Sequence, residues 1–462
     1  MLARRRTIVA AFLTTFCLFS AYYVWHKEPS NLVASLQDTQ SHLWQHLHPA
    51  LEKYAPDCPE PTQNGSPGLP RFDAIHETPR RSLLTNVDEL LQPMQAAHDG
   101  FVQATRNLNV GNAFVPGTVG IVSSAGGSYL PTFMVSLSFL RRTESMLPVG
   151  LFMKDQTEYE VHICETESIP PIEGFQIKPF AVLFSSYEKL IWLDADCVPL
   201  HDPTVLLEFE PFTSSGLVTW PDFWANTAAP VYFNISRQPE PSSTTRQATE
   251  AGIMLVSKLT HFPSLLLAAY YNSYGPNCYY SLLSQGAPGA GDKETLLHAA
   301  TALNQSFYAV SETVVDIGNV TPWDSQVAIN AGYVQADPIQ DYNLTSQGKW
   351  RVRDPSVAKP PGVFFIHASA PKFDPGKELL WEKLRGFDGN PTRLWTYPPE
   401  AMRRLGYDAE QRFWEETMSV ACTMESAFET WKAKSELCDG VRMHWKAVFE
   451  NPDIVMPTFT DD

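Results

Sequence analysis

The segment Leu190-Ile191-Trp192-Leu193-Asp194-Ala195-Asp196 ends an apolar run in two carboxylates that are one residue apart. In an extended chain, residues i and i+2 point to the same side, so Asp194 and Asp196 are expected to aim at one point where a strand leaves the core. Carboxylate oxygens suit Mg²⁺ or Mn²⁺. Such an ion can hold the diphosphate of a nucleotide-sugar and take up charge as that group leaves. The alternative is an ordinary Asp-containing strand end or turn, which a single tripeptide does not exclude.

The sequence around this segment alternates between expected strands and helices. We expect strands at 118–122, 149–153 and 159–163, and helices at 132–143, 178–187, 378–385 and 411–434. Asp202-Pro203 predicts an N-cap and the first residue of a further helix. This order predicts an α/β fold with a mainly parallel central sheet that is covered on both faces. In such sheets ligands bind beyond the carboxyl ends of strands, where Asp194 and Asp196 lie.

The N-terminus predicts a membrane anchor. Arg4, Arg5 and Arg6 precede the uncharged segment Thr7 to Trp25, which spans about 28 Å as a helix, close to the hydrocarbon thickness of a bilayer. The basic cluster predicts a cytosolic N-terminus and a lumenal remainder. A cleaved signal peptide is the alternative, but its apolar region is normally shorter. We therefore expect a cytosolic tail and transmembrane anchor at 1–26, a stem at 27–112, and a lumenal catalytic domain at 113–462 whose C-terminal part is helical from about 376.

Composition restricts the class of partner and the compartment. The chain has 462 residues, 44% of them hydrophobic, which permits a sizeable core, and a formal net charge of −17. That charge argues against a nucleic-acid partner and fits a neutral glycan. Six cysteines outside the apolar segment allow up to three disulfides in an oxidising lumen, with Cys422 and Cys438 as the expected local pair. A lumenal location also agrees with five glycosylation sequons, at Asn64, Asn234, Asn304, Asn319 and Asn343.

Two acidic segments supply further candidate catalytic groups. Glu250-Ala-Gly252 leads into an expected strand, and its carboxylate could hydrogen-bond sugar hydroxyls, although a solvent-exposed strand start explains it as well. Gly291-Asp292-Lys293-Glu294 precedes an expected helix. Acids in a first helical turn are favoured by the helix dipole, so a purely structural cap is the alternative. The functional interpretation places Asp292 or Glu294 beside a reacting sugar.

A histidine and two lysines complete the candidates. The strand Phe364 to His367 ends in an imidazole that could complete the coordination of a metal, and Lys372 follows closely enough to meet a phosphate. Lys178 opens the helix that leads into the acidic strand. Most histidines are not ligands, and most helix lysines are solvated charges, so these three assignments depend on their surroundings.

Four segments, in this order, carry a resemblance to a known family. They are Lys178-Pro-Phe-Ala-Val-Leu-Phe-Ser-Ser-Tyr-Glu-Lys-Leu-Ile-Trp-Leu-Asp-Ala-Asp-Cys-Val-Pro-Leu200, Thr219-Trp-Pro-Asp-Phe-Trp224, Glu250-Ala-Gly-Ile253 and Gly291-Asp-Lys-Glu294. Together they resemble the fungal alpha-1,3-mannosyltransferase family, Golgi enzymes that elongate mannan and O-linked mannose chains, over about residues 115 to 375. Two positions depart from that family: Glu250-Ala-Gly replaces the usual Glu-Ser-Gly type sequence, and Glu294 replaces a common Asp.

The resemblance implies a GT-A fold, a GDP-mannose donor, a mannose-containing glycan acceptor, Mn²⁺ and a retained anomeric configuration. It also implies a single-pass type II protein of the Golgi membrane. Carried over residue by residue, Asp194 and Asp196 serve the metal and the donor, Asp292 and Glu250 contact the reacting sugar, and likeness to the wider GT-A group adds His367 as a metal ligand. The expected substrate-binding residues are Lys178, Asp222, Glu250, Gly252, Gly291, Lys293 and Lys372.

Two alternatives stay open. The first is a GT-A glycosyltransferase that uses another nucleotide-sugar, such as a UDP-hexose. The second is a membrane-anchored glycan-binding protein that kept the fold without the chemistry. A hydrolase is less consistent with the sequence, because it contains neither Gly-x-Ser-x-Gly nor His-Glu-x-x-His.

Overall fold

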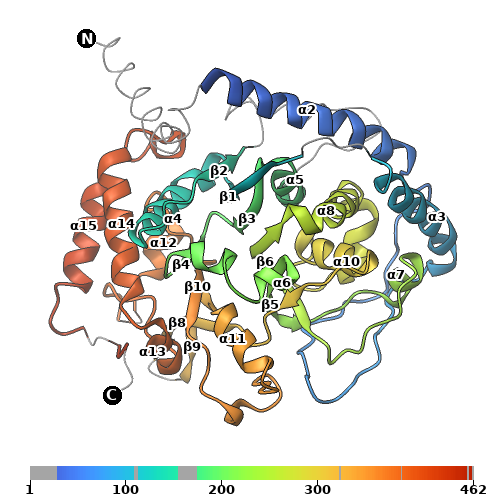
Figure 1. Cartoon of the computed structure of the whole chain (residues 1–462). Coiled ribbons are helices and arrows are strands. Elements are labelled where there is room, and N and C mark those ends of the chain that lie inside the picture. Colours follow the sequence, from blue (N-terminus) through green and yellow to red (C-terminus); the bar gives the residue numbers. More distant parts are fainter. Residues whose placement is uncertain are drawn as a thin grey trace.

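The computed structural model describes residues 29–108, 113–153, 174–321, 324–386, 388–454 and 457–459, and describes side chains there except for residues 29–39 and 320–330. In this part of the chain a six-stranded sheet has the order β2-β1-β3-β6-β5-β7, and a four-stranded sheet has the order β4-β10-β9-β8 (Figure 1). The strands are β1 (Val115–Ser124), β2 (Val149–Phe152), β3 (Tyr187–Leu193), β4 (Cys197–Pro199), β5 (Leu217–Ala225), β6 (Gln247–Ser257), β7 (Tyr308–Ala309), β8 (Val315–Thr321), β9 (Asp324–Ala336) and β10 (Val363–His367).

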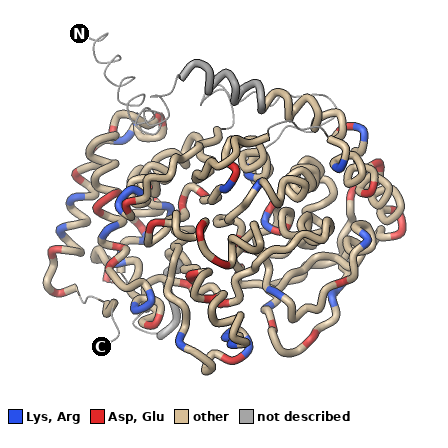
Figure 2. Tube along the Cα trace, in the orientation of Figure 1, with Lys and Arg blue, Asp and Glu red and all other residues tan. Residues whose placement is uncertain are grey.

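Helices surround these sheets. They are α2 (Pro29–Lys53), α3 (Val87–Thr105), α4 (Leu130–Arg142), α5 (Ile177–Phe184), α6 (Phe212–Ser215), α7 (Pro230–Ile235), α8 (Lys258–Ser273), α9 (Tyr280–Ser284), α10 (Thr295–Ala302), α11 (Pro338–Thr345), α12 (Glu378–Lys383), α13 (Pro399–Leu405), α14 (Ala409–Met424) and α15 (Leu437–Val448). Figure 2 shows charged residues of both signs along α14 and α15, as is typical of helices with one face in water.

The six-stranded sheet is mixed, which corrects the expectation of a mainly parallel sheet. β1 is parallel to β2 and β3, and β5 is parallel to β7, but β6 is antiparallel to both of its neighbours, β3 and β5. All residues of β6 are buried, so its apolar pattern matches that of a buried parallel strand and does not reveal its direction. Because Leu193 faces Ile253, the end of β3 lies beside the middle of β6, and the first residues of β6 extend beyond it.

The expected coverage of both sheet faces is confirmed. One apolar cluster contains Phe180 of α5, Leu267 of α8 and Leu297 of α10 together with Trp192 of β3. A separate cluster joins the two sheets, and within it the rings of Trp220 and Phe365 pack edge to face with centroids 5.2 Å apart. The acidic end of β3 therefore enters the region between two packed layers, which holds its side chains in place.

Most expected elements are present with shifted ends. The helices at 132–143, 178–187 and 378–385 correspond to α4, α5 and α12, and the strand at 149–153 corresponds to β2. Asp202 accepts a hydrogen bond from the amide of Thr204, but the turn that follows, Pro203–Leu207, is a 3₁₀ helix. The helix expected at 411–434 is shorter than expected, since α14 ends at Met424. The strand expected at 159–163 lies outside the described residues.

Part of the predicted stem packs on the main body. Leu47 and Leu51 of α2 are fully buried in the same cluster as α8. The Tyr270 hydroxyl donates to the Tyr54 carbonyl at 2.8 Å, and the Tyr274 hydroxyl donates to the Leu51 carbonyl at 2.7 Å. The chain from about residue 43 thus contributes to the core, while the limits of anchor, stem and catalytic domain stay predictions.

None of the helices in the described ranges has the length and apolar character needed to cross a bilayer. The expected anchor, Thr7 to Trp25, lies outside those ranges.

A disulfide joins α14 to α15 through Cys422 and Cys438, which confirms the expected local pair. The bond closes a loop between residues 16 positions apart. Replacing both cysteines with serine should lower the free energy of unfolding by about 3 kcal/mol, because the cross-link restricts the unfolded chain. Urea denaturation of the purified protein measures this loss. Each single replacement should cost as much as the double one, and additive losses would contradict the assignment.

Candidate functional site

The two acidic residues after β3 separate into different groups. Residues 195 and 196 form a turn, and the Asp194 carbonyl accepts a hydrogen bond from the Cys197 amide at 2.9 Å. The chain is therefore not extended here, and the rule that i and i+2 share a side does not apply. This corrects the expectation that both carboxylates aim at one point. Asp194 turns toward Lys178, and Asp196 turns toward His367.

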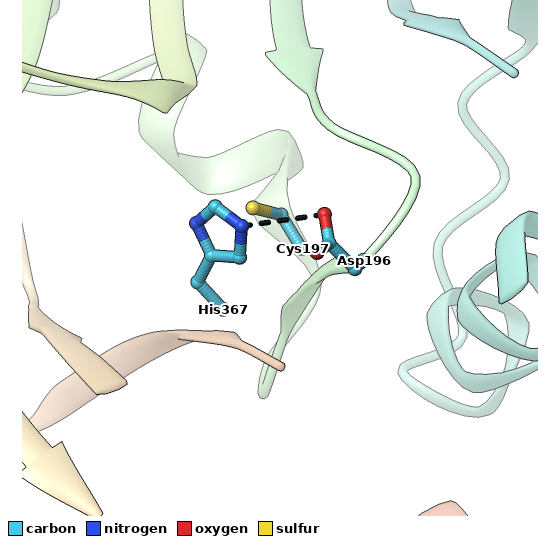
Figure 3. Close-up of side chains that lie close together, drawn as sticks. All are labelled: Asp196, Cys197 and His367. Carbon is cyan, nitrogen blue, oxygen red and sulfur yellow. Dashed lines mark ion pairs between the residues drawn. The ribbon is translucent and has the colours of Figure 1, made fainter. Parts of the chain in front are cut away.

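Asp196 lies in a buried cluster between the two sheets (Figure 3). His367, at the end of β10, pairs in register with Cys197 of β4. Its Nε2 lies 3.3 Å from Asp196 Oδ1, while the Lys372 ammonium bonds to Asp196 Oδ2. Burial alone would raise the pKa of Asp196, but His367 and Lys372 outweigh it and hold that pKa well below its usual range.

The same cluster offers a set of metal ligands. One ligand atom each from Asp196, Cys197 and His367 lie within 4.8 Å of one another. A carboxylate and an imidazole suit Mn²⁺, and a thiolate shifts the preference toward softer ions. The donor set therefore fits a divalent cation. Asp194, the other expected ligand, is not part of this group of three.

Protonation would limit metal binding at this cluster. Burial disfavours the imidazolium of His367, but Cys197 and Asp196 outweigh it and raise its pKa well above the usual value. Burial raises the pKa of Cys197 to about 12. Because ligands must lose their protons to bind a metal, binding here releases protons and weakens as the pH falls.

A second cluster surrounds Lys178, which lies in the first turn of α5 and is buried. Its ammonium lies 3.1 Å from Asp194 Oδ1 and 3.3 Å from Asp292 Oδ2, and it donates to the Ala251 carbonyl at 2.7 Å. Burial opposes its charge, but Asp194 and Asp292 outweigh burial and raise the pKa of Lys178. Lys178 is thus a buried cation that holds two carboxylates together and is not the ordinary solvated charge of a helix surface.

Glu250 lies between these clusters, inside β6 and buried. Its Oε1 accepts from the Gly252 amide at 2.6 Å and lies 3.3 Å from His367 Nδ1. Its Oε2 is buried and has no hydrogen-bond partner among the described residues. A buried carboxylate oxygen without a partner is costly, so this atom is an unused acceptor at the centre of the candidate site. The alternative that Glu250 is a solvent-exposed residue at the start of a strand is therefore wrong.

Glycines allow the backbone to approach these groups. A Cβ on Gly252 would lie 2.8 Å from both Cys197 Sγ and Glu250 Oε1, so a side chain there would displace the cluster. Gly291 has a φ of 140°, which strongly favours glycine, and it precedes Asp292.

The Gly291–Glu294 segment divides between two roles. Lys293 donates to Asp222 Oδ2 at 2.8 Å, which joins two expected substrate-binding residues. Glu294 is buried, pairs with Arg246 at 2.8 Å and accepts from the Thr249 amide at 2.6 Å. These partners outweigh burial and lower the pKa of Glu294 to about 2. Glu294 is therefore a satisfied structural carboxylate, and Asp292 is the acid of this segment that faces the Lys178 cluster.

Sequence reasoning missed two members of the site. Cys197 was considered only for disulfides, although its position directly after Asp196 signalled a possible ligand. Tyr333 of β9 was not considered, and its hydroxyl lies 2.6 Å from His367 Nδ1 and 3.4 Å from Glu250 Oε1. No sequence motif marks Tyr333, because only the pairing of β9 with β10 brings it to His367.

The sequence matches a family model and several curated proteins. Residues 162–249 and 242–340 match Mannosyl_trans3, described as "Mannosyltransferase putative". Alpha-1,2-mannosyltransferase MNN21 of Candida albicans is 31% identical over 414 residues, covering 70% of this chain and 61% of that protein. Alpha-1,2-mannosyltransferase MNN5 of Saccharomyces cerevisiae is 26% identical over 403 residues, covering 67% of this chain and 68% of that protein. The chain spans about three fifths of the length of the first relatives it matches.

Among solved structures, the glycosyltransferase GlyE of Streptococcus pneumoniae is similar with a TM-score of 0.30 and 13% identity, over 55% of this chain and 56% of that chain. The curated relatives named above are alpha-1,2-mannosyltransferases, so they do not support the alpha-1,3 linkage that the sequence resemblance implied. The chain is thus similar to fungal alpha-1,2-mannosyltransferases of the MNN2 and MNN5 type, and two overlapping segments of it match the Mannosyl_trans3 model.

Proposed function

We propose that this protein is a GT-A-type mannosyltransferase that transfers mannose from GDP-mannose to a mannose-containing glycan and makes an alpha-1,2 linkage. The linkage is taken from the names of the curated relatives, and the donor from the resemblance in the sequence. The observation that carries the proposal is the buried Oε2 of Glu250, which has no partner among the described residues and lies between the Asp196–Cys197–His367 cluster and the Lys178 cluster. A polar ligand with several hydroxyls satisfies such an oxygen.

Each cluster has a distinct part in this proposal. Asp196, His367 and Cys197 would hold Mn²⁺, which when bound supplies positive charge for the diphosphate. Lys372 can add its own charge to a departing phosphate. Asp292 and Glu250 would contact the mannose, and Lys178 keeps Asp292 and Asp194 in fixed positions. Restraining the acceptor hydroxyl near the anomeric carbon accounts for the rest of the rate enhancement.

The proposed location is the Golgi membrane, with Thr7 to Trp25 as the anchor and the catalytic domain in the lumen. Four sequon asparagines are exposed, which keeps them accessible to glycosylation: Asn64, Asn234, Asn304 and Asn343.

The proposed function is tested with purified protein, Mn²⁺ and a panel of donors. We expect release of GDP and transfer from GDP-mannose to alpha-linked mannobiose, and no transfer from UDP-glucose or UDP-galactose. Nuclear magnetic resonance of the product identifies the linkage, with alpha-1,3 as the competing outcome. A chelator should stop turnover and Mn²⁺ should restore it. Transfer from a UDP-sugar alone, or calorimetry that detects no GDP binding, would favour one of the two alternatives.

Tyr333→Phe should weaken Mn²⁺ binding and activity by about tenfold, because groups that orient a metal-ligating histidine commonly contribute 10- to 100-fold. The change removes only the hydroxyl that contacts His367. Titration with Mn²⁺ by calorimetry measures the affinity apart from turnover. Tyr407→Phe, which removes a hydroxyl bonded to the Leu200 carbonyl, is the matched control. Equal Mn²⁺ affinity in Tyr333→Phe and wild type would refute the positioning role.

A further inference from the structure

A pocket lies at the β7 edge of the six-stranded sheet, beside the candidate site. Its walls come from β5 at Thr219–Pro221, from the chain entering β6 at 244–249, from the end of β7 at 309–311, and from Phe72 and the segment around Trp350. The hollow is open, and its empty space of about 510 Å³ includes open solvent. A ligand here would therefore be only partly enclosed.

The lining combines aromatic rings with neutral hydrogen-bonding groups. Trp350 is 40% exposed, and the Arg353 guanidinium lies 5.5 Å from its ring centroid. Neutral hydroxyl and amide side chains line the same hollow, at Thr219, Thr244, Thr245, Gln247, Thr249 and Ser311. A hexose presents C–H groups on one face and hydroxyls at its rim, so it can stack on an aromatic ring and bond to hydroxyls at once.

The lining offers few groups that could hold a diphosphate. It contains no Asp or Glu that could bind a metal. Arg246 pairs with the buried Glu294, whereas Arg353, which lies over Trp350, keeps its charge. One guanidinium can donate to sugar hydroxyls, whereas a nucleotide diphosphate is usually held by several cations or by a metal.

The pocket adjoins the candidate site through one strand pair. Trp220 lines the pocket, and in the register of β5 with β6 it faces Glu250. Residues that face each other across two strands point to the same side of the sheet. A glycan with one residue in the pocket can therefore place a neighbouring residue beside Glu250.

We propose that this pocket is an acceptor subsite that binds a mannose residue of the glycan away from the reacting hydroxyl, with Trp350 as the stacking platform. The proposal rests on the proposed function and names which part of the chain selects the acceptor. The enzyme should consequently favour acceptors of several mannose residues over a single mannoside.

The test compares Trp350→Ala and Trp350→Phe with wild type on alpha-mannotriose and on methyl mannoside. Loss of an interaction that is equal in ground and transition state raises KM and leaves kcat unchanged. We expect Trp350→Ala to raise KM for mannotriose about tenfold, the usual cost of a lost apolar contact in a specificity pocket. KM for methyl mannoside and for GDP-mannose should not change, and Trp350→Phe should retain most of the affinity. Phe209→Ala removes an aromatic ring of similar exposure outside the pocket and is the control.

Saturation-transfer NMR with mannotriose and no donor tests binding to the subsite separately from mannosyl transfer. Wild type should show contacts that Trp350→Ala and Phe72→Ala lose. If wild type is active and neither Trp350→Ala nor Phe72→Ala changes the KM for mannotriose, the subsite is overturned. It is also overturned if these replacements raise the KM for GDP-mannose instead. A wild type that transfers no mannose yet binds mannotriose in a Trp350-dependent way would overturn the proposed function and keep the pocket.

Discussion

Asp196→Asn should lower kcat/KM for mannosyl transfer about 10³-fold, the loss typical of removing one positioned electrostatic group from an active site. The replacement keeps the shape of the side chain and removes its charge. It takes away the only carboxylate in the group formed with Cys197 and His367, and it leaves the Lys372 ammonium without its counter-ion. Because Mn²⁺ prefers anionic oxygen, binding of Mn²⁺ and of GDP should fall together.

The fold should survive this change. His367 can release its proton once the carboxylate is gone, since burial already disfavours its charged form. The Lys372 side chain remains 25% exposed and can reach water. Thermal unfolding checks the fold, calorimetry measures GDP binding with Mn²⁺, and Asp439→Asn on the exposed side of α15 is the control. A folded Asp196→Asn protein with undiminished turnover would exclude Asp196 from the chemistry.

Local patterns in the sequence predicted much of the framework. The apolar run that ends at Asp194, the helix that became α4 and the Cys422–Cys438 pair depend on neighbours a few residues apart, so periodicity and spacing reveal them. The direction of β6 depends instead on how a long connection between residues 226 and 246 returns the chain. Nothing in the composition of β6 records that path, and the expected parallel sheet was therefore mixed.

Several of the expected site residues lie near one another, but sequence reasoning did not predict how they are arranged. Asp196, His367, Glu250, Asp292 and Lys178 all lie in connected clusters, but the turn at 195–196 separates Asp194 from Asp196. Tyr333 enters only through strand pairing. Glu294 is adjacent to a site residue yet is fully occupied by Arg246, which spacing alone cannot show. The linkage depends on how an acceptor lies in the site, and motifs that bind the donor do not encode it.

Lys178→Met should lower the free energy of unfolding by about 3–5 kcal/mol, the usual cost of removing one partner from a buried ion pair. Methionine keeps the length and most of the volume of the side chain, so the loss is chiefly electrostatic. Asp292 would lose the cation 3.3 Å away, and Asp194 would lose the one 3.1 Å away. Urea denaturation at pH 7 measures the loss, and loss of transfer should accompany it, since Asp292 would leave its position.

The pH dependence distinguishes this electrostatic cause from a packing defect. Burial already raises the pKa of Asp292, with Lys178 opposing that shift. Without Lys178 the folded-state pKa rises further, so the native variant binds more protons than the unfolded chain at mildly acidic pH. A state that binds more protons gains stability as the pH falls, and the deficit of Lys178→Met should therefore shrink between pH 7 and pH 5. Lys178→Met with Asp292→Asn should recover part of the loss at pH 7, because it removes the stranded charge. A deficit that is equal at both pH values and unaffected by Asp292→Asn would mean that Lys178 acts through packing alone.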